Sequence, residues 1–95
     1  MQQYVLISGQ SKKLTNILNN FKEELLITNI KVVTPRIYFE TTIKDNFIKL
    51  LKNKIKENKT TQNYVYQIFP VDNGKIDYLP YISKDTKQKK YSYYK

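Results

Sequence analysis

The residues best suited to binding chemistry in this chain are lysines that recur along one segment, together with one arginine. Lys49, Lys52, Lys56 and Lys59 follow one another at intervals of three, four and three, which places them on one face of a helix. Ammonium groups in such a row suit contacts with a phosphate backbone, which supply affinity without reading sequence. Arg36 is the only arginine, and its planar guanidinium suits phosphate or carboxylate binding through two hydrogen bonds. With the pair at the start of the first predicted helix, the predicted nucleic-acid-binding residues are Lys12, Lys13, Arg36, Lys49, Lys52, Lys56 and Lys59.

The net charge points to the same class of partner. Seventeen basic residues stand against eight acidic ones, a formal net charge of +9. A field of this sign attracts polyanions, of which nucleic acid is the commonest. The chain is also rich in Lys, Asn, Ile and Tyr, as proteins of AT-rich genomes are, so a solvated lysine face is the alternative interpretation. That compositional drift raises lysine without requiring an excess over Glu and Asp.

The sequence offers little for catalysis. It contains no cysteine and no histidine, which excludes disulfides, thiolate metal sites, a thiol nucleophile and an imidazole general base. The acidic residues do not show the spacing of a metal-binding loop or of a carboxylate dyad. The sequence therefore favours a role that is not enzymatic and predicts no cofactor. Magnesium would be needed only if the chain were a nuclease.

The predicted elements follow the order β-α-β-β-α-β, with a possible extra C-terminal strand. Pro35 separates two strand-forming runs because proline cannot donate a ladder hydrogen bond. This order predicts an α+β, ferredoxin-like fold with two helices on one face of an antiparallel sheet, in a single domain over 1–82. A basic, tyrosine-rich tail follows at 83–95. The predicted strands are 3–8, two short strands within 29–40 separated by a break at Thr34-Pro35, 63–71 and 75–82. The predicted helices are 12–26 and a second helix that Thr41 or Thr42 caps and that runs to 57.

Periodicity also assigns the faces of these elements. Ser11 is the predicted cap of the first helix. Alternation in the strand 63–71 places Tyr64, Tyr66 and Ile68 on one side of the sheet. The first strand offers only Tyr4, so an RNA-recognition module with stacked aromatic pairs on its central strands is not predicted. The predicted buried faces of the two helices are Leu14, Ile17, Leu18, Phe21 and Leu25, and Ile43, Phe47, Leu50, Leu51 and Ile55.

The hydropathy pattern indicates a cytoplasmic protein. No apolar run approaches the ~18 residues of a membrane span. The N-terminal residues MQQYVLISG lack a basic region followed by a long apolar stretch, so no signal peptide is expected.

Two short motifs resemble a known family. Residues 32–40, VVTPRIYFE, and residues 68–71, IFPV, are similar to strand motifs of the smaller of the two core CRISPR adaptation proteins, once described as metal-dependent nucleases. The resemblance covers 3–82. It implies a ferredoxin-like homodimer in which a last strand, here 75–82, crosses to the partner subunit, and which holds duplex DNA between larger integrase subunits.

The chain departs from that family where the family's metal site would lie. The family's first strand commonly ends in Tyr-Asp-Ile, whose Asp is the proposed metal ligand, whereas this strand ends in Leu6-Ile7-Ser8-Gly9. The resemblance thus implies the architectural role without metal-dependent cleavage. We predict a nucleic-acid-binding homodimer that holds duplex DNA by backbone contacts. The alternatives are a small phage or plasmid protein that inhibits a host defence protein, and a divalent-metal nuclease of the same fold.

Overall fold

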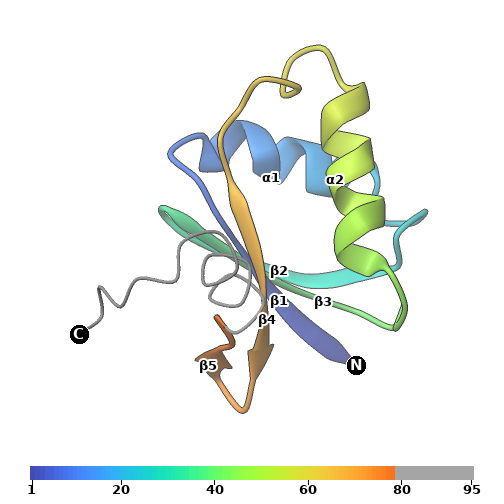
Figure 1. Ribbon diagram of the computed structural model, residues 1–95, viewed down its shortest axis with the longest axis vertical. Helices are drawn as coiled ribbons and strands as arrows, with labels where there is room; N and C mark the ends of the chain where they lie inside the picture. The colour runs from blue at the N-terminus through green and yellow to red at the C-terminus, as the bar shows by residue number, and fades with distance from the viewer. Residues whose placement is uncertain (79–95) are drawn as a thin grey trace, which may run out of the picture.

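One antiparallel sheet carries both helices on a single face, as the computed structural model shows (Figure 1). The structure describes residues 1–78, so the predicted tail and the second half of the last predicted strand, 79–82, lie outside the described residues. The elements are β1 Gln2–Ile7, α1 Ser11–Asn20, β2 Ile27–Val33, β3 Arg36–Thr41, α2 Phe47–Glu57, β4 Gln67–Asp72 and β5 Lys75–Ile76.

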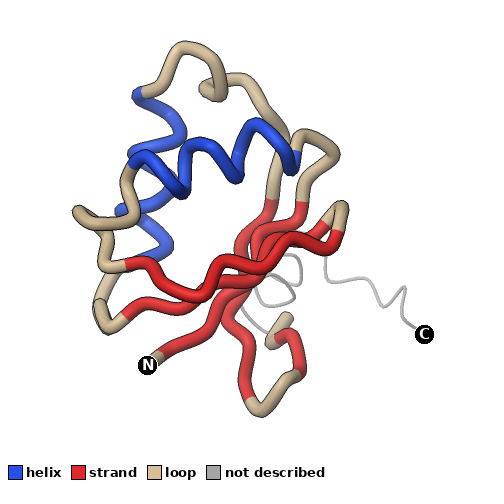
Figure 2. Tube along the Cα trace, turned by 180° about the vertical axis from the view of Figure 1, so that it is seen from behind, coloured by secondary structure: helices blue, strands red, loops and turns tan. Residues whose placement is uncertain are grey.

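The strand order is β2-β3-β1-β4-β5, and each neighbouring pair is antiparallel. β1 is central, paired with β3 on one side and β4 on the other. β2 and β3 form the hairpin predicted around Pro35, whose peptide bond with Thr34 is cis. Seen from behind, both helices stay on one side of the sheet (Figure 2). This arrangement confirms the predicted α+β, ferredoxin-like class, and β5 supplies the extra strand.

The two faces of the sheet bury separate apolar clusters. On the helix side, Leu6 of β1 and Phe39 of β3 pack with buried residues of both helices. On the opposite side, Val5, Phe69 and Val71 form a smaller buried cluster. This division follows from strand geometry, because successive side chains of a strand point to opposite faces.

The first helix is shorter than the predicted 12–26. α1 ends at Asn20, and the chain then turns until Leu26, whose φ of 52° is left-handed and incompatible with a helix. Leu25 is buried and Phe21 is partly buried, as predicted, but both contact the core from the turns. The apolar spacing continues past the end of the helix because it serves the core and not the helix alone.

The second helix begins later than predicted. Thr41 is the last residue of β3, so neither Thr41 nor Thr42 caps the helix; α2 begins at Phe47, after Asn46 with a left-handed φ of 60°. Leu50 was predicted to be buried and is 40% exposed. The buried residues of α2 are Phe47, Leu51 and Ile55.

Two further boundaries differ from the predictions. Ser11 is the first residue of α1 and Gln10 precedes it as the cap residue, so the prediction of Ser11 as the cap was wrong. β4 begins at Gln67 and not at 63, because β1 ends at Ile7, the partner of Gln67, and offers no backbone to earlier residues.

Candidate nucleic-acid interface

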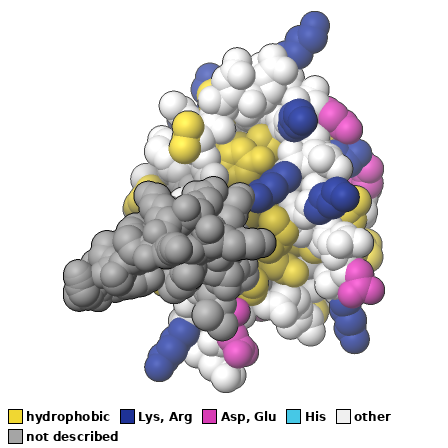
Figure 3. All heavy atoms as spheres, viewed as in Figure 1, with side chains coloured by type: hydrophobic (Ala, Val, Ile, Leu, Met, Phe, Trp, Pro, Cys, Tyr) yellow, Lys and Arg dark blue, Asp and Glu magenta, His cyan; other side chains and the backbone are white. Residues whose placement is uncertain are grey.

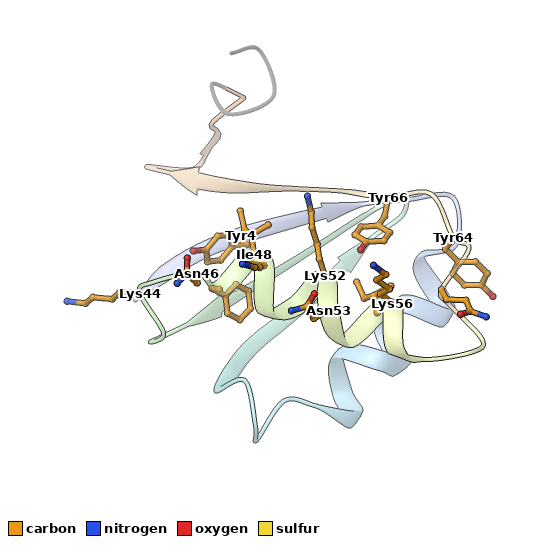
Figure 4. A pocket seen from close by; sticks show the side chains of 13 residues that line it. Tyr4, Lys44, Asn46, Ile48, Lys52, Asn53, Lys56, Tyr64 and Tyr66 are labelled. Atoms are coloured by element: carbon orange, nitrogen blue, oxygen red, sulfur yellow. The ribbon is translucent and has the colours of Figure 1, made fainter. Parts of the chain in front are cut away.

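An open groove runs along α2 on the helix side of the fold. Its volume is about 880 Å³, and it lies between α2 and the segment that leads into β4 (Figure 4). Basic and aromatic side chains make up much of its lining. The lining residues are Tyr4, Lys44, Asn46, Phe47, Ile48, Lys49, Lys52, Asn53, Ile55, Lys56, Gln62, Tyr64 and Tyr66.

Packing of α2 against the sheet positions the first wall of the groove. The ring centroid of Phe47 lies 4.9 Å from that of Tyr4 and 6.0 Å from that of Phe39, which anchors the start of the helix over β1 and β3. Leu51 and Ile55 continue the buried face toward the other end. Because these apolar residues face the sheet, Lys52 and Lys56, each one position after a buried residue, lie beside the buried face and line the groove.

Two buried or partly buried hydroxyl groups position the second wall. The Thr61 hydroxyl donates to the carbonyl oxygen of Ile55 at 2.9 Å and ties the loop to the end of α2. The Ser8 hydroxyl donates to the carbonyl oxygen of Val65 at 2.8 Å and ties the same segment to the end of β1. Tyr64 and Tyr66 lie on either side of Val65 and pack against the core, so their rings are held between fixed points.

The charge of the groove is positive without compensation. Lys44, Lys49, Lys52 and Lys56 are exposed, and no residue of the lining is acidic. Within residues 1–78 the structure contains one ion pair, between Lys54 and Glu24, away from this lining. The four groove lysines therefore have no intramolecular anion in the described part of the chain.

The paired lysine differs from the groove lysines in its surroundings. Lys54 lies 5.0 Å from the centroid of the Phe21 ring, and its hydrogen bond with Glu24 raises the pKa of its ammonium group above the ordinary value. Lys54 thus joins α2 to the turn after α1. In the space-filling view, hydrophobic side chains are exposed between Lys and Arg side chains on the face of Figure 1, whereas the visible acidic side chains lie toward its edges (Figure 3).

The structure brings some of the predicted binding residues together. Lys49, Lys52 and Lys56 line one groove, as the helical spacing indicated. Lys59 follows the end of α2 and does not continue the row, because the helix stops at Glu57.

Lys12 and Lys13 lie at the other helix, in the first turn of α1. Lys13 lines a separate hollow of about 290 Å³ with Asn58 and Thr60, the two neighbours of Lys59. Lys13 thus lies near the loop that carries Lys59, and none of Lys12, Lys13 and Lys59 lines the groove along α2.

Arg36 lies on the opposite face of the sheet. Ile37 belongs to the cluster on the helix side and Tyr38 to the cluster on the far side, so alternation places Arg36 on the far side as well. Its guanidinium donates to the Tyr38 hydroxyl at 3.2 Å, and this hydrogen bond raises the pKa of Arg36 above its ordinary value. Arg36 cannot contact a ligand held in the groove, so the predicted set is not one continuous surface.

The set of predicted residues also missed part of the groove. Lys44 precedes α2 and extends outward at one end of the lining (Figure 4). Tyr4, Tyr64 and Tyr66 supply aromatic surface that the predicted set did not include. Alternation in 63–71 was the available signal, because it places Tyr64 and Tyr66 on the same side as the buried Ile68.

Two further features, a cluster of metal-binding side chains and a membrane-spanning helix, are not found among the described residues. Residues 1–78 contain no group of three or more Asp or Glu side chains placed to hold a metal ion. In the same part of the chain, neither helix has the length and apolar character needed to cross a membrane.

Comparison with family models, with curated proteins and with solved structures finds no match to this chain. The resemblance to the smaller CRISPR adaptation proteins, the homodimer and the integrase partner therefore stay predictions, as does the alternative of a host-defence inhibitor.

Proposed function

We propose that this protein binds nucleic acid through the phosphate backbone, with the groove along α2 as the binding site. The observation that carries the proposal is the set of four exposed, unpaired lysines that line one groove without any acidic neighbour in the lining. The positive charges of these lysines repel one another, and a bound polyanion would neutralise them. Phosphate groups supply that charge at regular intervals.

The proposed mechanism is electrostatic. Each phosphate that a lysine neutralises releases condensed counterions, so the affinity falls as the salt concentration rises. Four such contacts predict a slope of about −3 when the logarithm of the affinity is plotted against the logarithm of the salt concentration. Lysine ammonium groups act here as point charges, so little preference for base sequence is expected.

The test is fluorescence anisotropy of labelled oligonucleotides between about 50 and 200 mM salt. The variant carries Lys49→Glu, Lys52→Glu and Lys56→Glu, all at exposed positions where the fold makes no use of the charge. We expect its affinity to fall at least roughly tenfold at low salt, and its salt slope to approach about −1, since one groove lysine remains.

A matched control carries the same change of charge elsewhere. Lys22, Lys31 and Lys75 are exposed and lie outside the groove, so their replacement by glutamate gives a variant of equal net charge. Circular dichroism establishes that both variants are folded. Equal losses in the two variants would show that net charge, and not the groove, determines binding, and would overturn the assigned site.

A further inference from the structure

The aromatic side chains in the groove indicate which form of nucleic acid it binds. Tyr64 and Tyr66 are partly exposed and line the wall opposite α2, and the ring of Tyr4 lies in the lining although it is only 6% exposed. Figure 4 shows Lys52 and Lys56 projecting from α2 on the side where Tyr66 and Tyr64 lie. Cationic groups and aromatic rings therefore meet along one groove, and a purely electrostatic site would need only the cations.

This pairing of charge and rings is the chemistry of single-strand recognition. Proteins that bind single strands track the backbone with a positive groove and stack bases on aromatic side chains. A duplex keeps its bases stacked inside the helix, so it would reach the rim lysines but leave the rings of Tyr64 and Tyr66 unused. The groove thus contains aromatic surface that the backbone of a duplex would not contact.

The dimensions of the groove agree with such a ligand. Its volume of about 880 Å³ falls within the ~300–1,000 Å³ of sites that enclose small organic groups, enough for roughly one or two nucleotides. Lys52 and Lys56 are one helical turn apart, roughly 6 Å along the axis of α2, which suits successive phosphates of an extended strand. The hydrogen bonds of the Thr61 and Ser8 hydroxyls hold the segment that carries Tyr64 and Tyr66. This wall of the groove is therefore formed before a ligand binds.

We infer that the groove binds a single-stranded segment of nucleic acid, with phosphates on the lysines of α2 and at least one unpaired base against Tyr64 or Tyr66. This inference rests on the proposed backbone binding and narrows it from nucleic acid in general to a single strand. It also differs from the duplex DNA that the sequence predicts.

The test compares three probes with the same number of phosphates at about 50 mM salt: a thymidine oligonucleotide of about eight nucleotides, an abasic strand, and a short duplex. We expect the thymidine strand to bind roughly five- to hundredfold tighter than the abasic strand for each base that stacks. We also expect it to bind more tightly than the duplex.

Two variants connect the preference to the tyrosines. Tyr64→Leu and Tyr66→Leu keep apolar contact with the core and remove the ring, so they should weaken binding of the thymidine strand and leave the abasic strand unchanged. Tyr38→Leu, on the opposite face of the sheet, is the matched control and should change neither. Thermal unfolding checks that each variant is folded.

The outcomes separate the inference from the proposed function. The single-strand inference is wrong if thymidine and abasic strands bind equally, or if the duplex binds most tightly. Backbone binding stands in either case, provided that the affinity of all three probes falls as the salt concentration rises. If the Tyr38 control weakens thymidine binding as much as the groove variants do, the inference is also wrong. If no probe binds at low salt, the proposed function itself is wrong.

Discussion

Replacing Thr41 by valine removes a hydroxyl group that joins three segments of the fold. Thr41 ends β3 and is completely buried. Its hydroxyl donates to the carbonyl oxygen of Leu25, just before β2, at 2.9 Å, and accepts from the backbone N–H of Ile43, on the way to α2, at 3.1 Å. One side chain therefore connects the end of the first helical crossover and the start of the second to the sheet.

The structure sets the size of the expected loss. Each hydrogen bond contributes about 1 kcal/mol net, and a partner left buried and unpaired costs about 1–3 kcal/mol. The methyl group of valine, buried in place of the hydroxyl, returns up to about 0.8 kcal/mol. The free energy of unfolding of the Thr41→Val variant should thus be about 2 kcal/mol lower than that of the parent chain. This corresponds to a Tm lower by about 8–16 °C for a domain of this size.

The assay is urea unfolding followed by far-ultraviolet circular dichroism. The dependence of the free energy of unfolding on urea concentration is compared between variants, because an unchanged slope shows that only stability has changed. The neighbouring Thr42 is exposed, so Thr42→Val applies the same chemical change without a buried hydrogen bond and should have little effect. A free energy of unfolding for Thr41→Val within about 0.5 kcal/mol of both the parent chain and the control would refute this account.

Two other predictions concern the core beside the groove. Leu51→Ala removes a fully buried side chain and should lower the free energy of unfolding by about 2–5 kcal/mol in urea, whereas Leu50→Ala, at a 40% exposed position, should lower it far less; equal losses would contradict the packing. Burial raises the pKa of the Tyr4 phenol above 10.0, so the folded state favours the neutral form and stability should fall as the pH rises above about 10. Unfolding measured between about pH 9 and pH 11 should show a smaller fall for Tyr4→Phe, and an unchanged fall would contradict the role of Tyr4.

Local pattern in the sequence was enough to predict the order of elements and the α+β class. The run from Ile30 to Phe39 reads as two strands around Pro35 because β-branched and aromatic residues favour extended backbone while proline interrupts a ladder. The phase of α2 was also predictable, because Phe47, Leu51 and Ile55 repeat at the helical period. That phase sets the side of the helix on which Lys49, Lys52 and Lys56 lie. These features depend on residues close together in the chain.

Element boundaries were less accessible to local pattern. Phe21 and Leu25 continue the apolar spacing of α1, yet they contact the core from turns. Leu50 has the same apolar character as Leu51 and remains 40% exposed, because the sheet covers only part of the helix. Apolar periodicity shows which residues seek the core and does not show which element carries them there.

The make-up of the groove was decided by tertiary structure. Strand register placed Arg36 on the far face of the sheet, away from the lysines with which the sequence had grouped it. The hydrogen bond between Ser8 and Val65 spans 57 positions of sequence and brings the tyrosine segment opposite α2. The sequence by itself determined the elements and their apolar faces through local periodicity. Only the pairing of distant segments decided which charges and rings share one site, because that depends on strand register and on contacts between residues far apart in the chain.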